Sequence, residues 1–204
     1  MVHSSMRRGP GEALVIPSGP TVPAVLVDQH HRMRQLLREV AAGEGIPRRE
    51  AFESFRRLLA AHETAEEIVV RPVSRQIMDR DVVAERNHEE RRIVRLLAEL
   101  EKVDACGAVF EELFPSFTDA LDTHLTLEET FEFPILEAEL DLRDRIVMAR
   151  WIHRALALGP THAHPGAFGS PAAQRAVTPF TALVDHARDV YDRAREHSPG
   201  RRPS

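Results

Sequence analysis

The sequence predicts an all-α protein: an antiparallel four-helix bundle with additional C-terminal helices. Apolar residues recur at steps of three and four along four long segments, the spacing that keeps side chains on one helix face. No segment alternates β-branched and polar residues, so strands are not expected. Short connections join the four segments, which favours antiparallel packing of neighbouring helices.

The helices of the bundle follow in order, each with one apolar face. Their expected ranges are about 25–41, 48–70, 82–103 and 109–130. Because proline lacks the backbone N–H and clashes with the preceding turn, the second helix is expected to bend or stop near Pro72 and the fourth to end near Pro134. A fifth amphipathic segment covers 140–158 and a last helix 181–197, joined by a connection rich in proline and glycine at 159–179.

This pattern divides the chain into three parts. Residues 1–23, which hold four prolines and three glycines and lack periodicity, are expected to form a flexible N-terminal arm. Residues 24–140 are expected to form the four-helix bundle. Residues 141–204 form a C-terminal helical extension that contains the Pro/Gly-rich linker.

Composition excludes several classes of function. The chain of 204 residues has a net charge of −5, so it lacks the basic surface that a nucleic-acid partner requires. No apolar run approaches the ~20 residues that span a membrane, and no signal peptide is recognisable, so a cytoplasmic location is expected. The single cysteine, Cys106, allows neither an internal disulfide nor a thiolate metal site. A homodimer is compatible with this composition, and the oligomeric state stays open.

The most informative feature is a repeat of the pattern F-x-x-F-x-x-x-L-x-x-H-x-x-x-E-E-x-x-x-x-P, which occurs twice, 62 positions apart. It places His62 with Glu66, and His124 with Glu128, one turn apart on the apolar stripe of a helix. An unpaired carboxylate in that position is costly, and a metal ion accepts both imidazole and carboxylate. Exposed His–Glu pairs would not explain why both copies lie on the stripe. These four residues are therefore predicted metal ligands.

The helix before each copy repeats as well, with His30 and Glu90 in equivalent positions 60 residues apart. His30 lies on the core stripe and is predicted to be a ligand rather than a core histidine without a metal. His31 points about 100° away and is expected on the surface.

The third helix offers three candidates. Glu90 flanks the apolar stripe and is the counterpart of His30, so it is the first choice, ahead of Glu89 and then His88, which points away. The alternative for Glu90 is a surface salt bridge with Arg86.

Three further glutamates lie near the stripes. Glu63 stands where the second copy has Leu125, and it either adds a ligand to one metal or pairs with an inward arginine such as Arg86. Glu67 and Glu129 lie at the stripe edges, as surface carboxylates or as acceptors that orient a histidine through its other N–H.

The ordered series His30, His62-x-x-x-Glu66, Glu90 and His124-x-x-x-Glu128 resembles the hemerythrin-like (HHE cation-binding) family over about residues 24–140. The resemblance implies a four-helix bundle that holds two non-haem iron ions bridged by carboxylates. Carried across, Glu66 and Glu128 would be the bridges, and His30, His62, His124 and Glu90 terminal ligands. The C-terminal third, with His162 and His164 in a loop and not expected to bind metal, resembles an extension of actinobacterial members.

Two departures from the family bear on function. Glu90 stands where the family has a histidine, and Arg92 follows His88 where the oxygen carriers have a second histidine. A carboxylate in place of an imidazole favours the ferric state. The resemblance therefore implies a protein that binds or reacts with O2, peroxide or NO, with catalase-like decomposition of hydrogen peroxide as one activity. The alternatives are an iron sensor or storage protein without turnover, and a purely structural bundle.

Overall fold

The structure is a computed structural model that describes residues 18–158, without the side chains at 80, 81, 83–85, 87, 157 and 158. Most of the expected N-terminal arm, the linker, the last expected helix and His162 and His164 lie outside the described residues. Within residues 18–158 every regular element is helical, which confirms the predicted all-α class. The elements are α1 (Val22–Ala42), α2 (Gly45–Val69), α3 (Arg71–Ile77), α4 (Arg80–Leu100), α5 (Ala108–Leu127), η1 (Glu128–Glu132), α6 (Phe133–Glu139) and α7 (Leu142–Leu158).

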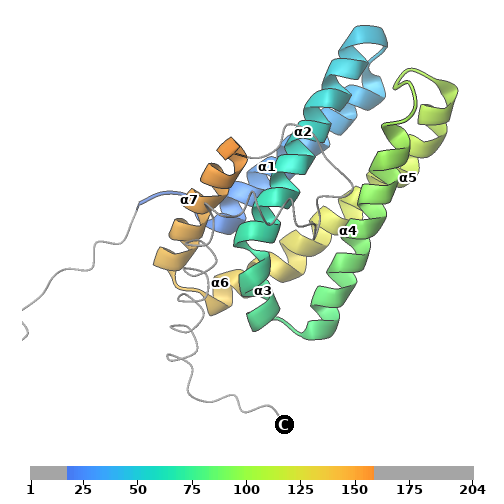
Figure 1. The fold of residues 1–204 in the computed structure, drawn as a ribbon. Coiled ribbons are helices and arrows are strands. Elements are labelled where there is room, and N and C mark those ends of the chain that lie inside the picture. The colour runs from blue at the N-terminus through green and yellow to red at the C-terminus, as the bar shows by residue number, and fades with distance from the viewer. Residues whose placement is uncertain (1–17, 159–204) are drawn as a thin grey trace, which may run out of the picture.

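Two helical hairpins build the bundle. Helix α1 packs against α2, and α4 packs against α5 (Figure 1). Only two residues separate α1 from α2, and Gly45 at the start of α2 has φ of 57°, a left-handed conformation that glycine adopts without a Cβ clash. The hairpin pairing follows the duplication seen in the sequence.

Both hairpins break their second helix at the same place in the repeat. Helix α2 ends at Val69 and α3 begins at Arg71, with Pro72 in its first turn, as expected for a bend or stop there. In the other hairpin α5 ends at Leu127, a π-helical turn covers Glu128–Glu132, and α6 continues with Pro134 in its first turn. The expected regular helix to residue 130 was therefore wrong at its end, and α6 was not foreseen.

The core consists of two apolar clusters with a polar layer between them. One cluster includes Leu26, Val69 and Leu136, near α6 and α7. The other lies toward the opposite end of the bundle, where Phe55 and Phe117 meet edge to face with ring centroids 5.6 Å apart. Along α1 and α2, His30 and His62 lie between residues of these two clusters, and His124 lies near the end of α5, before Phe133 of the first cluster. The two clusters therefore enclose the site on both sides along the bundle.

Helix α7 covers one side of the first hairpin. It packs against α1 and α2 (Figure 1) through buried side chains such as Met148 and Ile152. Its range agrees with the expected fifth amphipathic segment. Among the described residues, no helix combines the length and apolar character needed to cross a membrane.

Candidate metal centre

The structure brings all seven predicted ligands into two neighbouring groups. The first, called the His30 group, draws on α1, α2 and η1, and the second, the His124 group, on α2, α4 and α5. Within each group one ligand atom per residue lies within 4.8 Å of all the others. The His30 group is His30, His62, Glu66 and Glu128, and the His124 group is Glu63, Glu90 and His124.

Glu128 faces both groups. Its Oε2 lies 3.4 Å from Nε2 of His30, and its Oε1 lies 3.2 Å from Nε2 of His124. The side chain is 1% exposed, so water does not solvate this charge. One carboxylate with an oxygen toward each group is the arrangement that a bridging ligand requires. Glu66 lies in the His30 group, with Oε1 3.7 Å from Nε2 of His62, and its bridging role stays a prediction.

Two of the three histidines are held by a partner on Nδ1. The Nδ1 of His62 lies 2.7 Å from the amide oxygen of Gln29, and the Nδ1 of His30 lies 2.8 Å from a carboxylate oxygen of Glu129. Because both oxygens can only accept, each Nδ1 carries the hydrogen and each Nε2 is a free donor to a metal. Glu129 thus has the orienting role that the sequence left open for it.

The short distance between Nε2 of His30 and Nε2 of His62 indicates whether a cation fits between the two rings. They lie 3.3 Å apart, and in these tautomers neither carries a hydrogen. Two imidazole lone pairs at this separation repel each other unless a proton or a metal ion lies between them. The His30 group therefore has the geometry of a cation site.

His124 is held differently. It is fully buried, and neither ring nitrogen makes a hydrogen bond to a described residue. Its Nε2 lies 3.7 Å from Glu63, and its Nδ1 lies 3.9 Å from Glu89. Buried polar atoms without partners are rare in folded proteins and point to an ion or water at the site. A metal on Nε2 would satisfy this nitrogen.

The three candidates of the third helix occupy different places, and the assignment of Glu90 as a ligand stays a prediction. Glu90 lies in the His124 group, Glu89 lies outside both groups, and His88 is exposed. Arg86 pairs with Glu89 at 2.9 Å, so it is not the described partner of either Glu63 or Glu90. The cation that contacts Glu90 is Arg71 of α3.

Burial and neighbouring charges shift the pKa values of the ligands in opposite directions. Burial raises the pKa of Glu66 well above its ordinary value, and the charges of Glu128 and Glu63 raise it further. Burial lowers the pKa of His62 to about 4, so this ring is neutral at neutral pH. Burial also lowers the pKa of His124, but Glu128 and Glu63 outweigh that effect and bring it well above the ordinary value.

Together these shifts show a site with excess negative charge. Without a metal, burial and the neighbouring carboxylates favour the protonated form of Glu66, and the charges of Glu128 and Glu63 favour the protonated form of His124. Two carboxylate oxygens at the site, one on Glu63 and one on Glu128, make no hydrogen bond to a described residue. The donor set of imidazole nitrogen and carboxylate oxygen, without thiolate, suits non-haem iron.

Three buried polar residues beside the site were not predicted. Glu132 lies one turn beyond Glu128, is 3% exposed and accepts a 2.5 Å hydrogen bond from the hydroxyl of Ser74. Its spacing of four from Glu128 was a usable signal, although its counterpart in the first copy is Val70. Arg71 is also 3% exposed, and nothing in the local sequence distinguishes it from a surface arginine.

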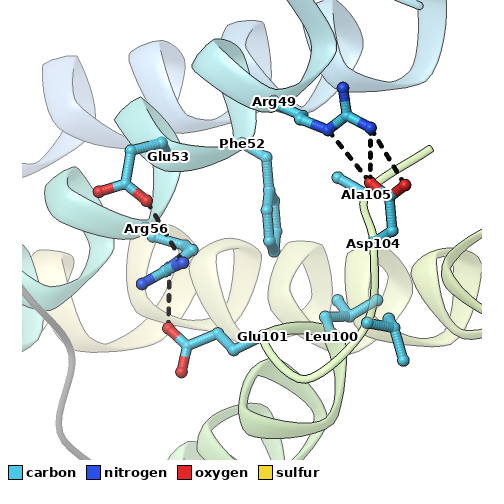
Figure 2. Close-up of a pocket in the computed structure, with 9 residues that line it drawn as sticks. Arg49, Phe52, Glu53, Arg56, Leu100, Glu101, Asp104 and Ala105 are labelled. Carbon is cyan, nitrogen blue, oxygen red and sulfur yellow. Dashed lines mark hydrogen bonds and ion pairs between the residues drawn. The ribbon is translucent and has the colours of Figure 1, made fainter. Parts of the chain in front are cut away.

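A surface pocket of about 230 Å³ lies away from these groups, between α2 and the end of α4 (Figure 2). Its arginines are already paired: Arg49 with Asp104 and Arg56 with Glu101. It shares no residue with either group. Glu53 also pairs with Arg56, so all five charged side chains of the pocket lie in ion pairs with one another, and the pocket offers no unpaired charge to a ligand.

Comparisons with known proteins agree with this geometry. A helical fold of similar arrangement occurs in the crystal structure of a hemerythrin HHE cation-binding domain-containing protein from Mycobacterium kansasii, with a TM-score of 0.61. That match covers 83% of this chain and 99% of the other. Because the two sequences are 17% identical, the likeness shows the fold alone. An uncharacterized hemerythrin-like protein of Schizosaccharomyces pombe is 28% identical over 138 residues, 66% of this chain and 68% of the relative.

The family comparison covers the bundle itself. The sequence model of the hemerythrin HHE cation-binding domain matches residues 21–136, which is more than half of the chain and includes every residue of both groups. The matched range begins just before α1 and ends within α6. The chain therefore belongs to the hemerythrin HHE cation-binding domain family and is a metal-binding protein.

Proposed function

We propose that this protein is a non-haem di-iron protein that binds or reacts with O2, peroxide or NO and decomposes hydrogen peroxide. The observation that carries the proposal is the position of Glu128, whose two carboxylate oxygens face a histidine of each group at 3.4 and 3.2 Å. Such a carboxylate joins two ligand groups into one two-metal site.

Each metal has a defined set of protein ligands in this proposal. The His30 group holds one ion and the His124 group the other, with Glu128 shared between them. Glu66 serves as a second bridge, and Glu63 is a terminal ligand of the second ion. Inward carboxylates and histidines from facing helices are the common way in which bundles hold paired iron ions.

The charge of the site favours peroxide chemistry over reversible oxygen carriage. Glu63, Glu66, Glu90 and Glu128 supply four carboxylates, against three histidines. Anionic ligands stabilise the ferric state, and a pair of iron ions supplies the two-electron changes that peroxide chemistry requires. Disproportionation turns two molecules of hydrogen peroxide into two of water and one of dioxygen, so it needs no outside reductant.

The chain's own residues control the surroundings of this chemistry. The two apolar clusters exclude bulk water from both sides of the polar layer. Glu129 and Gln29 keep Nε2 of His30 and His62 free of hydrogen. Burial and the nearby charge of Glu128 raise the pKa of Glu132, which favours its protonated form.

Metal analysis and gas measurement together test the proposal. Protein loaded with ferrous iron without oxygen and then exposed to air should contain two irons per chain and absorb in the near ultraviolet. Adding hydrogen peroxide should then release dioxygen, measured with an oxygen electrode. Two irons without oxygen release would instead favour an iron sensor or store, and absence of iron would contradict any metal function.

A pair of histidine variants supplies the control. His124→Ala removes a ligand nitrogen and should lower the iron content. His88→Ala changes an exposed histidine in α4 and should leave two irons and full oxygen release. Equal iron loss in both variants would contradict the assignment of the site.

A further inference from the structure

Equivalent positions in the two halves of the bundle carry different residues and make different contacts. His30 and Glu90 are equivalent positions of the repeat, and so are Phe133 and Arg71, each the first residue after the helix break. At one contact between the halves the ring of His30 in α1 stacks on Phe133 in α6, with centroids 5.5 Å apart and planes at 29°. At the equivalent contact the carboxylate of Glu90 in α4 meets the guanidinium of Arg71 in α3. Thus a neutral pair of rings is exchanged for a pair of opposite charges.

Arg71 is buried in a way that an ordinary surface arginine is not. Its exposed fraction is 3%, whereas Arg75, one turn further along α3, is 51% exposed and pairs with Glu67. A buried guanidinium is costly unless anions surround it. Burial acts to lower the pKa of Arg71, but the charges of Glu66, Glu132 and Glu128 raise it, so the residue remains a cation.

A second comparison between the halves explains why a cation is needed at this place. His30 donates from Nδ1 to Glu129, and the equivalent contact in the other half would join Glu90 to Glu67. Two carboxylates cannot make that hydrogen bond without a proton or a cation between them. Arg71 contacts Glu90, and its Nε lies 3.9 Å from Glu67. It therefore links the two carboxylates.

We propose that Arg71 is a positioning residue for the second metal: it holds Glu90 in the His124 group and balances the charge introduced where the other half has a histidine. The proposal rests on the proposed two-metal function. Glu90 is 14% exposed, so without Arg71 its carboxylate can turn toward water, where a charge is better solvated. Glu90 and Arg71 consequently form a matched set, and neither residue can be exchanged alone.

The direct test converts the second half into a copy of the first. Arg71→Phe leaves Glu90 without its cation, and Glu90→His leaves Arg71 without its closest anion, so each single variant should retain about one iron per chain. The double variant Arg71→Phe/Glu90→His recreates the His30–Phe133 pair and should recover two. Two irons in Arg71→Phe alone, or no recovery in the double variant, would overturn the proposal.

Conservative variants separate charge from packing. Arg71→Lys keeps the positive charge and should retain two irons, whereas Arg71→Met, of similar length but neutral, should retain one. The matched control Arg75→Met alters the exposed arginine of the same helix and should retain two. Equal iron content in the Lys and Met variants would show that the charge of Arg71 has no role.

Thermal unfolding of the metal-free proteins distinguishes this inference from the proposed function. If the wild-type chain binds fewer than two irons, the two-metal function is wrong. The coupling of Glu90 with Arg71 is still measured without metal: the double variant should unfold at a higher temperature than the sum of the two single losses predicts. Additive losses would overturn the coupling, whatever the metal content of the wild type.

Discussion

The three histidines of the metal centre differ in what holds the ring nitrogen Nδ1. His62 contacts the neutral amide of Gln29, and His30 contacts the carboxylate of Glu129, which Arg34 holds in place with a 2.7 Å contact. His124 makes no hydrogen bond to a described residue. A carboxylate on the outer nitrogen raises the basicity of an imidazole and fixes its orientation more strongly than an amide does. His30 is therefore the best-oriented of the three imidazole donors.

Replacing Glu129 should weaken metal retention without removing a ligand. In Glu129→Gln the carboxylate charge that orients His30 is lost, and the Arg34 contact weakens with it. Loss of such a partner typically lowers metal affinity about 10–100-fold. Competition with a chelator should show this decrease. The equivalent residue of the other copy, Glu67, is 46% exposed and pairs with Arg75 and Arg71 rather than with a histidine, so Glu67→Gln is the comparison and should lower the affinity less than Glu129→Gln does.

Metal binding should release protons and become tighter as the pH rises. In the metal-free fold the pKa of Glu66 lies well above 4.5 and that of His124 well above 6.5. Both groups must lose their protons to bind a metal, so the metal-free state binds more protons than the loaded state. The affinity should therefore fall as the pH falls through these raised pKa values. A pH indicator in weak buffer measures the released protons, and affinity independent of pH would contradict this account.

At the scale of the helices, the repeat predicted what both hairpins share and could not predict where they differ. Steps of three and four placed the inward histidines and glutamates correctly, because a regular helix fixes their directions. The prolines signalled both breaks. The π-helical turn at Glu128–Glu132 has no counterpart in the first copy, which carries the same proline spacing, so periodicity alone could not reveal it.

The unforeseen residues show the same limit. The inward position of Glu132 could have been predicted from its helical spacing to Glu128. Arg71, by contrast, is buried because α3 packs near the site. Its partner Glu90 comes from another hairpin. Contacts between halves depend on how two helices are placed relative to each other, and a one-dimensional pattern does not contain that information. The paired charges of Arg71 and Glu90 therefore emerged only from the structure.

The aromatic contact between α2 and α5 should dominate the stability of the apolar cluster that contains it. Phe117 is fully buried and meets Phe55 edge to face, so Phe117→Ala removes a large side chain and leaves a cavity. Such a substitution typically costs about 3–5 kcal/mol of unfolding free energy. Urea unfolding measures it. Phe131 in η1 is 59% exposed, and Phe131→Ala should cost less than about 1 kcal/mol.

At the scale of the whole molecule, the polar layer both divides the core and joins the hairpins. Ligands from the first hairpin (His30, His62, Glu63 and Glu66) meet Glu90 and His124 of the second, with Glu128 between the groups. Their buried carboxylates repel one another in the metal-free chain: burial raises the pKa of Glu66, and the charges of Glu128 and Glu63 raise it further. A metal ion converts this repulsion into attraction between the hairpins. The metal therefore belongs to the energetics of the fold as well as to the site.

Removing the metal should consequently lower the thermal stability of the entire bundle. A ligand that binds only the folded state at a thousandfold excess over its Kd stabilises it by about 4 kcal/mol. For a domain of this size that corresponds to a decrease in Tm on the order of 10 °C when a chelator removes the metal. Differential scanning calorimetry of the loaded and stripped protein measures this change. The matched variant Glu128→Gln replaces the carboxylate that faces both groups, so its Tm should respond far less to added iron; an equal response would mean that the stabilising ion binds elsewhere.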